Sequence, residues 1–221
     1  MNYRFAPAFI SHACTPFYDF VTTLGGCGKS FQIKVMEHAN IQNNERVLDV
    51  GCGSGTLVLL IKARHPECDV VGVDPDKKIL NIARKKLVKN NVRVDLIQAF
   101  AEKLPFDDLS FDVVVSALTF HHLPTEIKKQ ALREIYRVLK SDGRLLLADI
   151  GKPYSLFWKL KYLFDFERIF MGNNYMEDNL AGKLPYFMQE AGLHVKELAP
   201  RYHGTQFLLA KKDSLGSLMV A

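Results

Sequence analysis

The sequence predicts one α/β domain in which a mostly parallel sheet carries helices on both faces. Between Arg46 and Ile150, short runs of Val, Ile and Leu alternate with longer segments of helical periodicity. The short runs are almost continuously apolar, which is typical of strands buried on both faces. At 221 residues the chain is long enough for one well-cored domain with modest decoration. Strand–helix–strand alternation of this kind implies right-handed crossovers between parallel strands.

Each strand is placed by a β-type apolar run. The predicted strands are Arg46–Val50, Val70–Val73, Val92–Ile97, Phe111–Val115 and Arg144–Asp149, with Leu193–Leu198 and Thr205–Lys211 in the tail. No internal repeat and no linker to a second domain interrupts this pattern.

The helices between the strands are placed by apolar residues three and four positions apart. One helix begins at about Thr56, a second includes Ile79 and Leu87, and a third runs from Ile127 to Leu139. Ser141-Asp142-Gly143 is expected to break the third helix before the next strand. A last helix is predicted near residues 178–191. The many lysines of the second helix are expected to form a solvated face.

Composition is that of an ordinary globular protein, with 48% hydrophobic and 24% charged residues. The sequence shows no apolar run long enough for a transmembrane helix and no signal peptide, so a cytoplasmic protein is expected. Its four cysteines are scattered, which favours reduced thiols over disulfides, and no metal site is expected. The formal charge of +5 permits an anionic partner, but the absence of a long basic extension weighs against nucleic acid.

A glycine-rich turn directly after the first strand is the most informative motif. Gly51, Gly53 and Gly55 allow a sharp turn and a close approach of a ligand to the backbone. Such a turn can serve a dinucleotide or S-adenosylmethionine (SAM). The dinucleotide pattern requires Gly or Ala where this chain has Thr56. Asp49 would repel a pyrophosphate but would suit the ammonium group of a methionine moiety, so the turn favours SAM.

An acidic residue at the end of the second strand adds to this argument. Asp74 follows Gly55 by nineteen residues and is succeeded by Pro75. A carboxylate at this place can accept hydrogen bonds from both hydroxyls of a ribose. An Asp before a Pro is otherwise usually a turn or a helix cap.

Five segments in order and spacing resemble the catalytic core of class I SAM-dependent methyltransferases, particularly those of quinone biosynthesis. They are VLDVGCGSG (47–55), GVDPD (72–76), AEKLPF (101–106), SFDVVVSALTFHHL (110–123) and EIYRVLKSDGRLLLADI (134–150). The resemblance implies a Rossmann-like fold with a seven-stranded sheet of order 3-2-1-4-5-7-6 whose last strand is antiparallel. Two β-like runs in the tail agree with that expectation.

The resemblance also implies roles for individual residues around SAM. The three glycines surround methionine and ribose, Asp49 lies near the ammonium group and Asp74 on the ribose hydroxyls. The remaining cofactor-binding residues that it implies are Tyr18 at the methionine end, Cys52 and Pro75 within their segments, Ala101 and Phe100 beside the adenine, and Ser116 near the sulfonium. In one departure, Phe100 stands where the family often has an Asp that binds the adenine amino group.

Histidines 121 and 122 follow the fourth strand on the expected acceptor side. Histidine is the usual general base near neutral pH, so either ring is a candidate catalytic base. A structural or substrate-lining role is the alternative, because a His-His-Leu turn is frequent in the resembling family. Gly25–Ser30 lacks the first glycine of a P-loop and is interpreted as a turn between two N-terminal helices.

The segment 153–170 is apolar around almost its whole circumference as a helix. Such a helix must be buried, whether as a lid over an apolar substrate, in a homodimer or at a membrane surface. The chain is therefore divided into a helical cap (1–44), a SAM-binding core (45–150), a lid-like insertion (151–177) and a C-terminal helix and hairpin (178–221).

The function predicted from the sequence is methyl transfer from SAM to a small, apolar acceptor of quinone or lipid type. The two rivals are an NAD-linked oxidoreductase and a non-catalytic relative that keeps the SAM pocket. SAM supplies an activated methyl group, so the protein has chiefly to bind and align the two reactants.

Overall fold

The computed structural model describes residues 28–158 and 175–212, and its centre is a single seven-stranded sheet. The strands are β1 (Arg46–Val50), β2 (Asp69–Asp74), β3 (Asp95–Gln98), β4 (Phe111–Ala117), β5 (Leu139–Ile150), β6 (Leu193–Tyr202) and β7 (Thr205–Lys212). Their order is β3-β2-β1-β4-β5-β7-β6, and only β7 runs antiparallel to its neighbours β5 and β6. The predicted topology is thereby confirmed.

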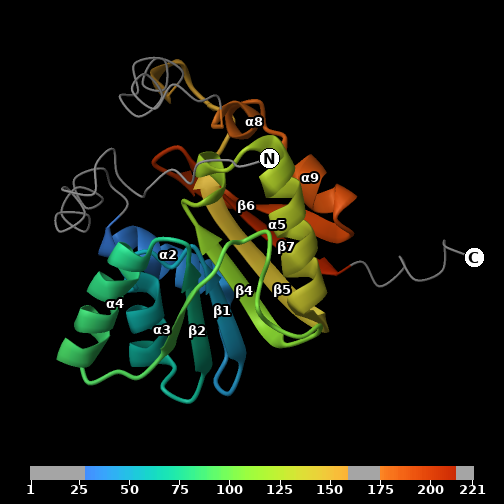
Figure 1. Cartoon of the computed structure of the whole chain (residues 1–221). Coiled ribbons are helices and arrows are strands. Elements are labelled where there is room, and N and C mark those ends of the chain that lie inside the picture. The colour runs from blue at the N-terminus through green and yellow to red at the C-terminus, as the bar shows by residue number, and fades with distance from the viewer. Residues whose placement is uncertain (1–27, 159–174, 213–221) are drawn as a thin grey trace, which may run out of the picture.

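Helices cover both faces of this sheet (Figure 1). They are α2 (Lys29–Ala39), α3 (Thr56–Arg64), α4 (Lys77–Lys89), α5 (Thr125–Val138), α8 (Glu177–Leu180) and α9 (Leu184–Glu190), together with the 3-10 helix η2 (Phe120–His122). Side chains of α2, α3 and α4 join one buried cluster, and side chains of α5 and α9 join the other. The sheet is therefore the middle layer of three.

Strand β1 shows how the sequence creates two cores. Val47 belongs to the cluster beneath α2 and α3, whereas Leu48 and Val50 belong to the cluster beneath α5 and α9. Successive side chains of a strand point to opposite faces, so a continuously apolar strand supplies both layers. Each such fully buried side chain stabilises the fold by about 1.5–3 kcal/mol.

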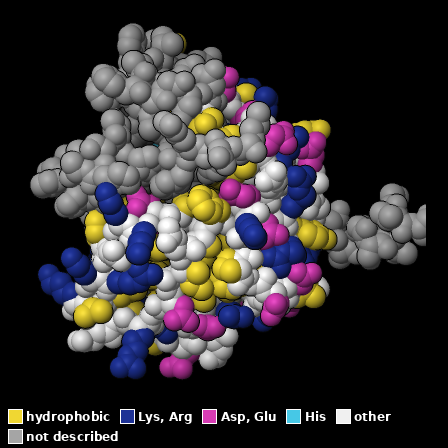
Figure 2. Space-filling model, in the orientation of Figure 1, with side chains coloured by type: hydrophobic (Ala, Val, Ile, Leu, Met, Phe, Trp, Pro, Cys, Tyr) yellow, Lys and Arg dark blue, Asp and Glu magenta, His cyan; other side chains and the backbone are white. Residues whose placement is uncertain are grey.

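Helix α4 combines a cap, an apolar face and a charged face. The side chain of Asp76 caps its first turn by accepting the backbone N–H of Lys78 at 2.8 Å. Its buried residues are Ile79, Leu80, Ala83 and Leu87, while its lysines are exposed or half-buried. Figure 2 shows Lys and Arg side chains gathered where α4 lies in Figure 1, as the sequence predicts for a solvated face.

Several boundaries differ from the sequence-based expectation, and those on either side of β3 and α5 have a clear cause. Strand β3 begins at Asp95 rather than Val92, because the N–H of Val92 bonds to Leu87 O at 3.0 Å and closes the end of α4. Helix α5 ends at Val138, and residues 139–143 already belong to β5, where the pairing register with β4 shifts. Gly143 is required there because a Cβ would lie 3.0 Å from Phe111 O.

The expected single helix near residues 178–191 is in fact two short helices. Between α8 and α9 stands Gly182, whose φ of +75° is a left-handed conformation that ends a helix. Helix α9 then begins with Leu184 and carries a proline in its first turn.

Helix α2 is fastened to the sheet by Arg144 of β5, beside the amino end of β1. The guanidinium group of Arg144 donates to the carbonyl oxygens of Ala39 at 2.7 Å and Asn40 at 2.6 Å. It also forms a two-pronged ion pair with Glu45 at 2.7 and 2.8 Å. These contacts join residues about a hundred positions apart in the sequence.

Within residues 28–158 and 175–212, no helix has both the length and the apolar character needed to cross a bilayer. The same residues contain no group of three His, Cys, Asp or Glu side chains that could hold a metal ion.

Candidate functional site

The sheet order places the expected ligand-binding crevice at the carboxyl ends of β1 and β4. The chain leaves β1 toward α3 on one face and leaves β4 toward α5 on the other face. Ligands of open α/β sheets bind where the direction of winding changes in this way. Asp49, Asp74 and Asp149 all lie at or next to carboxyl ends of strands along this edge.

The glycine turn after β1 is held against β2 by its backbone. The N–H groups of Gly51 and Cys52 both donate to Val73 O, at 2.8 and 3.0 Å. Gly51, Gly53 and Gly55 have φ values of +79°, +52° and +73°, which other residues rarely adopt. At Gly51 a Cβ would also lie only 2.1 Å from Thr119 Oγ1. The turn therefore requires glycine for both conformation and space.

Asp49 is a buried carboxylate with unused bonding capacity. Its side chain is 2% exposed, and its Oδ2 atom has no hydrogen-bond partner among the described residues. Burial, and secondly the neighbouring charge of Asp74, raise the pKa of Asp49 to about 8. A buried, unsatisfied carboxyl group beside a glycine turn fits a cationic ammonium group, as SAM would supply.

Asp74 is held in place by two backbone groups. Its Oδ2 accepts the N–H of Gly53 at 3.0 Å, and its Oδ1 accepts the N–H of Asp76 at 2.9 Å. Burial raises the pKa of Asp74 to about 6, against the lowering effect of these two bonds. Each carboxylate oxygen has a second lone pair, so the fixed carboxylate can still accept two ribose hydroxyls. Pro75 follows it, and Pro75 O accepts the amide of Gln98 at 3.0 Å.

The remaining predicted cofactor residues differ in what their side chains can offer. Cys52 is 7% exposed and its Sγ packs toward Gly72, so it can offer the ligand only its backbone. Ala101 is 8% exposed, whereas the Phe100 ring is 43% exposed and is available for stacking. Ser116 is fully buried and donates its hydroxyl to Val50 O at 2.8 Å, which ties β4 to the start of the glycine turn.

A lysine of α4 also holds the glycine turn, and sequence reasoning missed it. Lys86 Nζ donates to Ser54 Oγ at 3.0 Å and to Thr56 Oγ1 at 2.8 Å. The periodicity of α4 places Lys86 among its solvated lysines and gives no sign of this contact.

Asp149, near the carboxyl end of β5, joins β5, η2 and α8 through its side chain. Its side chain is 1% exposed, and among the described residues it accepts five hydrogen bonds. The donors are the backbone N–H groups of Thr119, Phe120 and Ile150, the Nδ2 of Asn179, and the Nδ1 of His121 at 2.7 Å. Burial alone would raise the pKa of Asp149, but His121 and the backbone donors lower it. Sequence reasoning treated Asp149 only as the end of a strand.

The two histidines of η2 lie together but in different settings. Their ring centroids are 3.9 Å apart. His121 is 7% exposed and bonds to Asp149, whereas His122 is half-buried. Burial, and then the charge of His121, lower the pKa of His122 to about 3, with Asp149 opposing the shift. His122 therefore stays neutral near pH 7.

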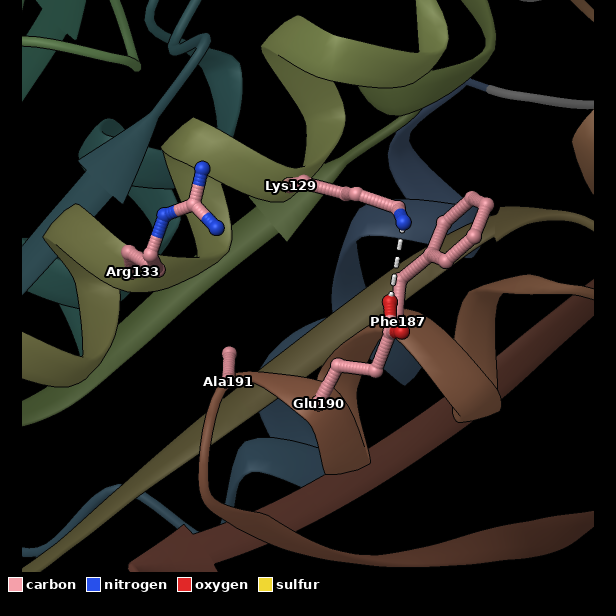
Figure 3. A pocket seen from close by; sticks show the side chains of 5 residues that line it. All are labelled: Lys129, Arg133, Phe187, Glu190 and Ala191. Atoms are coloured by element: carbon pink, nitrogen blue, oxygen red, sulfur yellow. Dashed lines mark ion pairs between the residues drawn. The ribbon is translucent and has the colours of Figure 1, made fainter.

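A separate hollow of about 280 Å³ lies between α5 and α9 (Figure 3). Lys129, Arg133, Phe187, Glu190 and Ala191 line it. Lys129 Nζ pairs with Glu190 at 3.1 Å and lies 5.1 Å from the centre of the Phe187 ring. None of the predicted site residues belongs to it, so it is distinct from the crevice above.

Tyr18, the Gly25–Cys27 part of the N-terminal turn and residues 159–170 of the apolar segment lie outside the described residues. Their predicted roles stay predictions.

Comparisons with known proteins agree with this geometry. A family model described as a methyltransferase domain matches residues 47–143. The chain is 34% identical over 156 residues to a demethylmenaquinone methyltransferase of Thermus thermophilus, a match covering 70% of each chain. It is also 34% identical over 153 residues to the ubiquinone/menaquinone biosynthesis C-methyltransferase UbiE of Pseudomonas paraeruginosa, where it spans 67% of this chain but only 59% of the relative.

The solved structures show the same fold. A SAM-dependent methyltransferase from Aquifex aeolicus superposes with a TM-score of 0.70 at 22% identity, covering 91% of this chain and 98% of that one. The Bacillus subtilis protein YcgJ gives a TM-score of 0.64 at 26% identity, with 77% and 71% covered. With a sheet of the predicted order, a glycine turn beside a buried carboxylate and relatives of this identity, the chain belongs to the class I SAM-dependent methyltransferases, and its cofactor is SAM.

Proposed function

We propose that this chain transfers the methyl group of SAM to a small, apolar acceptor that carries a quinol-type ring. The observation that carries methyl transfer is the unsatisfied carboxyl group of Asp49 beside the glycine turn. The acceptor class is supported by relatives named for methylation in menaquinone and ubiquinone biosynthesis. The match spans only 59% of the length of the Pseudomonas relative, so the acceptor is an inference from family.

The proposed cofactor contacts follow from the chemistry of each group. Asp49 would bind the ammonium group, and pairing would stabilise its ionised form. Asp74, already oriented by the N–H of Gly53, would accept the ribose hydroxyls. Ala101 and the exposed Phe100 ring would flank the adenine. Ser116, Cys52 and Pro75 would contribute through the backbone or through the position of neighbouring strands, and Tyr18 would contact the methionine end.

Methyl transfer from a bound sulfonium is an in-line displacement that the cofactor makes chemically easy. What the protein must add is alignment of the acceptor with the methyl group, which can supply several orders of magnitude in rate. The rigid edge formed by β1, β4 and β5 can provide that alignment, because Asp49, Ser116 and Asp149 are all fixed within it.

The acceptor would enter from the side of the segment 151–177, for which we propose a lid function. In its described part, Tyr154, Leu156 and Phe157 are 56%, 71% and 68% exposed, whereas Trp158 is 8% exposed. An apolar acceptor needs such a surface along its route. A homodimer, a peripheral membrane contact and a cytoplasmic location stay predictions.

The proposal is tested with SAM labelled on its methyl group. The protein is incubated with a cell extract separated into lipid, small-molecule, RNA and protein pools, and in parallel with chemically reduced demethylmenaquinone. Label in the lipid pool and in the added quinol is expected. Label in the RNA or protein pool instead would refute the acceptor class. Binding of S-adenosylhomocysteine without transfer to any pool would indicate a non-catalytic relative.

A further inference from the structure

We propose that His121, oriented by Asp149, accepts the proton of a hydroxyl group on the methyl acceptor. The acceptor is then an acid of the enol or phenol class, and Asp149 is a positioning residue. This inference rests on the proposed methyl transfer and adds to it a proton acceptor and a requirement on the substrate.

The carboxylate of Asp149 is held by hydrogen bonds from several elements. Its Oδ2 accepts the N–H groups of Thr119 at 3.0 Å and Phe120 at 2.7 Å, which caps the first turn of η2. Its Oδ1 accepts Ile150 N at 2.7 Å and Asn179 Nδ2 at 3.2 Å. The carboxylate is thus held by β5, by η2 and by α8 together.

The hydrogen bond to Asp149 determines the tautomer of His121. The lowered pKa of Asp149 keeps this carboxylate ionised near neutral pH, so it can only accept hydrogen bonds. At 2.7 Å, His121 Nδ1 must therefore be the donor. In the neutral ring the lone pair is then on Nε2, which is the nitrogen that can take up a proton. A carboxylate that fixes an imidazole in this way also stabilises its protonated form.

His121 and His122 differ in their capacity to accept a proton. His122 lies beside His121 but its pKa is lowered to about 3, so it is a weak proton acceptor near pH 7. Two further charged groups, Lys128 and Asp178, pair with each other near Asp149. Lys128 is fully buried and its Nζ lies 3.5 Å from Asp178 Oδ2 and also bonds to Tyr175 O.

Thr119 places His121 close to the glycine turn. Thr119, two residues before His121, donates through its Oγ1 toward Val50 O at 3.4 Å and Ala117 O at 3.2 Å. A Cβ on Gly51 would overlap this threonine side chain, so the two turns are in close contact. The ring is therefore fixed relative to the place where the methionine end of SAM is proposed to bind.

The proposed step balances as follows. The acceptor O–H bond breaks, its electron pair stays on the acceptor, and the proton goes to His121 Nε2. The new bond forms between the methyl carbon and the oxyanion or a carbon conjugated with it, while the methyl–sulfur pair stays on sulfur. A product methylated on carbon regains its hydroxyl when the ring hydrogen moves to oxygen. The imidazolium then releases its proton to water.

The tautomer is measured first, because it needs no turnover. Protein labelled with 15N on histidine is saturated with S-adenosylhomocysteine, and the ring nitrogens of His121 are assigned by comparison with His121→Gln. The expected spectrum shows a protonated Nδ1 and an unprotonated Nε2 in the neutral ring, and loss of that preference in Asp149→Asn. A neutral ring protonated on Nε2 overturns the proposal.

The rate is measured next, with reduced demethylmenaquinone as the acceptor or with whichever pool receives label. His121→Gln is expected to lower kcat by about 100-fold or more, the usual contribution of a general base, with an unchanged Kd for S-adenosylhomocysteine. His122→Gln is expected to lower kcat less than His121→Gln does. On a quinol with a more acidic hydroxyl, His121→Gln should recover part of its rate, which a purely structural role of His121 would not produce.

The outcomes separate this inference from the proposed function. If wild-type protein transfers methyl groups but His121→Gln is as fast, or a labelled product has no ionisable hydroxyl, only the inference is wrong. If wild-type protein fails to bind S-adenosylhomocysteine, the proposed function is wrong. Asp149→Asn keeps the shape of the carboxylate, so a folded variant with a wild-type rate would likewise overturn the positioning role.

Discussion

Asp49 and Asp149 lie at the same edge of one sheet, both almost fully buried, in opposite chemical environments. Asp49 on β1 has an oxygen without a partner among the described residues and a pKa raised to about 8. Asp149 on β5 accepts five hydrogen bonds from described residues and has a lowered pKa. A buried carboxyl group that is left unsatisfied destabilises the fold until a ligand pairs with it, whereas a satisfied one stabilises the fold itself. The first therefore indicates a binding site and the second a support.

The largest expected effect comes from removing the satisfied carboxylate. Asp149→Ala should lower the free energy of unfolding by about 3–5 kcal/mol, because it leaves several buried donors unpaired. Urea unfolding measures this. Asp108→Ala is the control, since exposed Asp108 only pairs with Arg137 and should cost about 0–1 kcal/mol. Equal losses in the two variants would contradict the comparison.

Gly51 lies where the two regions meet. Gly51→Ala should destabilise the fold by about 2–4 kcal/mol, from the left-handed backbone and from the overlap with Thr119. Gly182→Ala is a matched variant, because Gly182 has a similar φ of +75° but its nearest neighbour, Lys152 Cβ, is 3.5 Å away. It should lose only the backbone contribution. Thermal unfolding of both variants checks the difference, and an equal loss would remove the steric argument.

Replacing the unsatisfied carboxyl group should affect binding more than folding. Asp49→Asn is expected to weaken the binding of S-adenosylhomocysteine by about 1.5–3 kcal/mol, the usual contribution of a charge-assisted hydrogen bond. Calorimetry measures this, with Asp95→Asn at the amino end of β3 as the control. If Asp49→Asn binds as tightly as wild type, Asp49 is not the ammonium ligand.

Asp49 also gives a pH dependence whose sign can be worked out. Unfolded aspartate ionises near pH 4, whereas the folded group retains its proton up to about pH 8. Between these values the unfolded state binds fewer protons, so stability falls as the pH rises. Asp74, with its pKa raised to about 6, adds a decline over the lower part of this window. Asp49→Asn should flatten the curve of unfolding temperature between pH 5 and 8.

A smaller effect is expected at the adenine end. Phe100→Ala removes an exposed ring, so it should not change the stability of the fold. If the ring stacks on adenine, the substitution should weaken the binding of S-adenosylhomocysteine by about 1–2 kcal/mol. Leu109→Ala, another exposed apolar residue, is the control. Unchanged affinity would leave Phe100 as a surface residue.

The smallest expected effect is the release of a proton when S-adenosylhomocysteine binds. At pH 7 the Asp49 carboxyl group of the free protein is mostly protonated, and pairing with an ammonium group lowers its pKa. Binding of S-adenosylhomocysteine should therefore release up to about one proton. The calorimetric enthalpy should then vary with the ionisation enthalpy of the buffer. A buffer-independent enthalpy would contradict the raised pKa.

The positions of Asp49, the three glycines and Asp74 at strand ends were predictable from the sequence, whereas the bonds of Asp149 were not. Asp49, the three glycines and Asp74 are close together along the chain, and local rules for strands and turns place them. The bonds of Asp149 to His121 and Asn179 join residues 28 and 30 positions apart. No periodicity reports such a pairing, although a charged residue at the end of a buried strand, in Leu147-Ala148-Asp149, was a usable signal.

The strands were likewise predictable from local patterns. The prediction was wrong where a boundary depends on contacts with another element. β-type apolar runs identified all seven strands, and the resemblance to class I methyltransferases implied their order. The boundaries at Val92 and Leu139 depend on backbone bonds to other elements, and the register shift opposite Gly143 depends on β4. Gly182 was visible in the sequence, but its effect on the last helix depends on a backbone conformation that the apolar pattern does not report.

The guanidinium group of Arg144 secures the first described helix beside the amino end of β1, whereas Asp149 lies near the carboxyl end of β5. Mechanical anchorage and chemistry therefore occupy opposite rims of the sheet. Substitutions at the carboxyl edge leave the contacts of Arg144 untouched, so such variants are expected to keep α2 attached to the sheet.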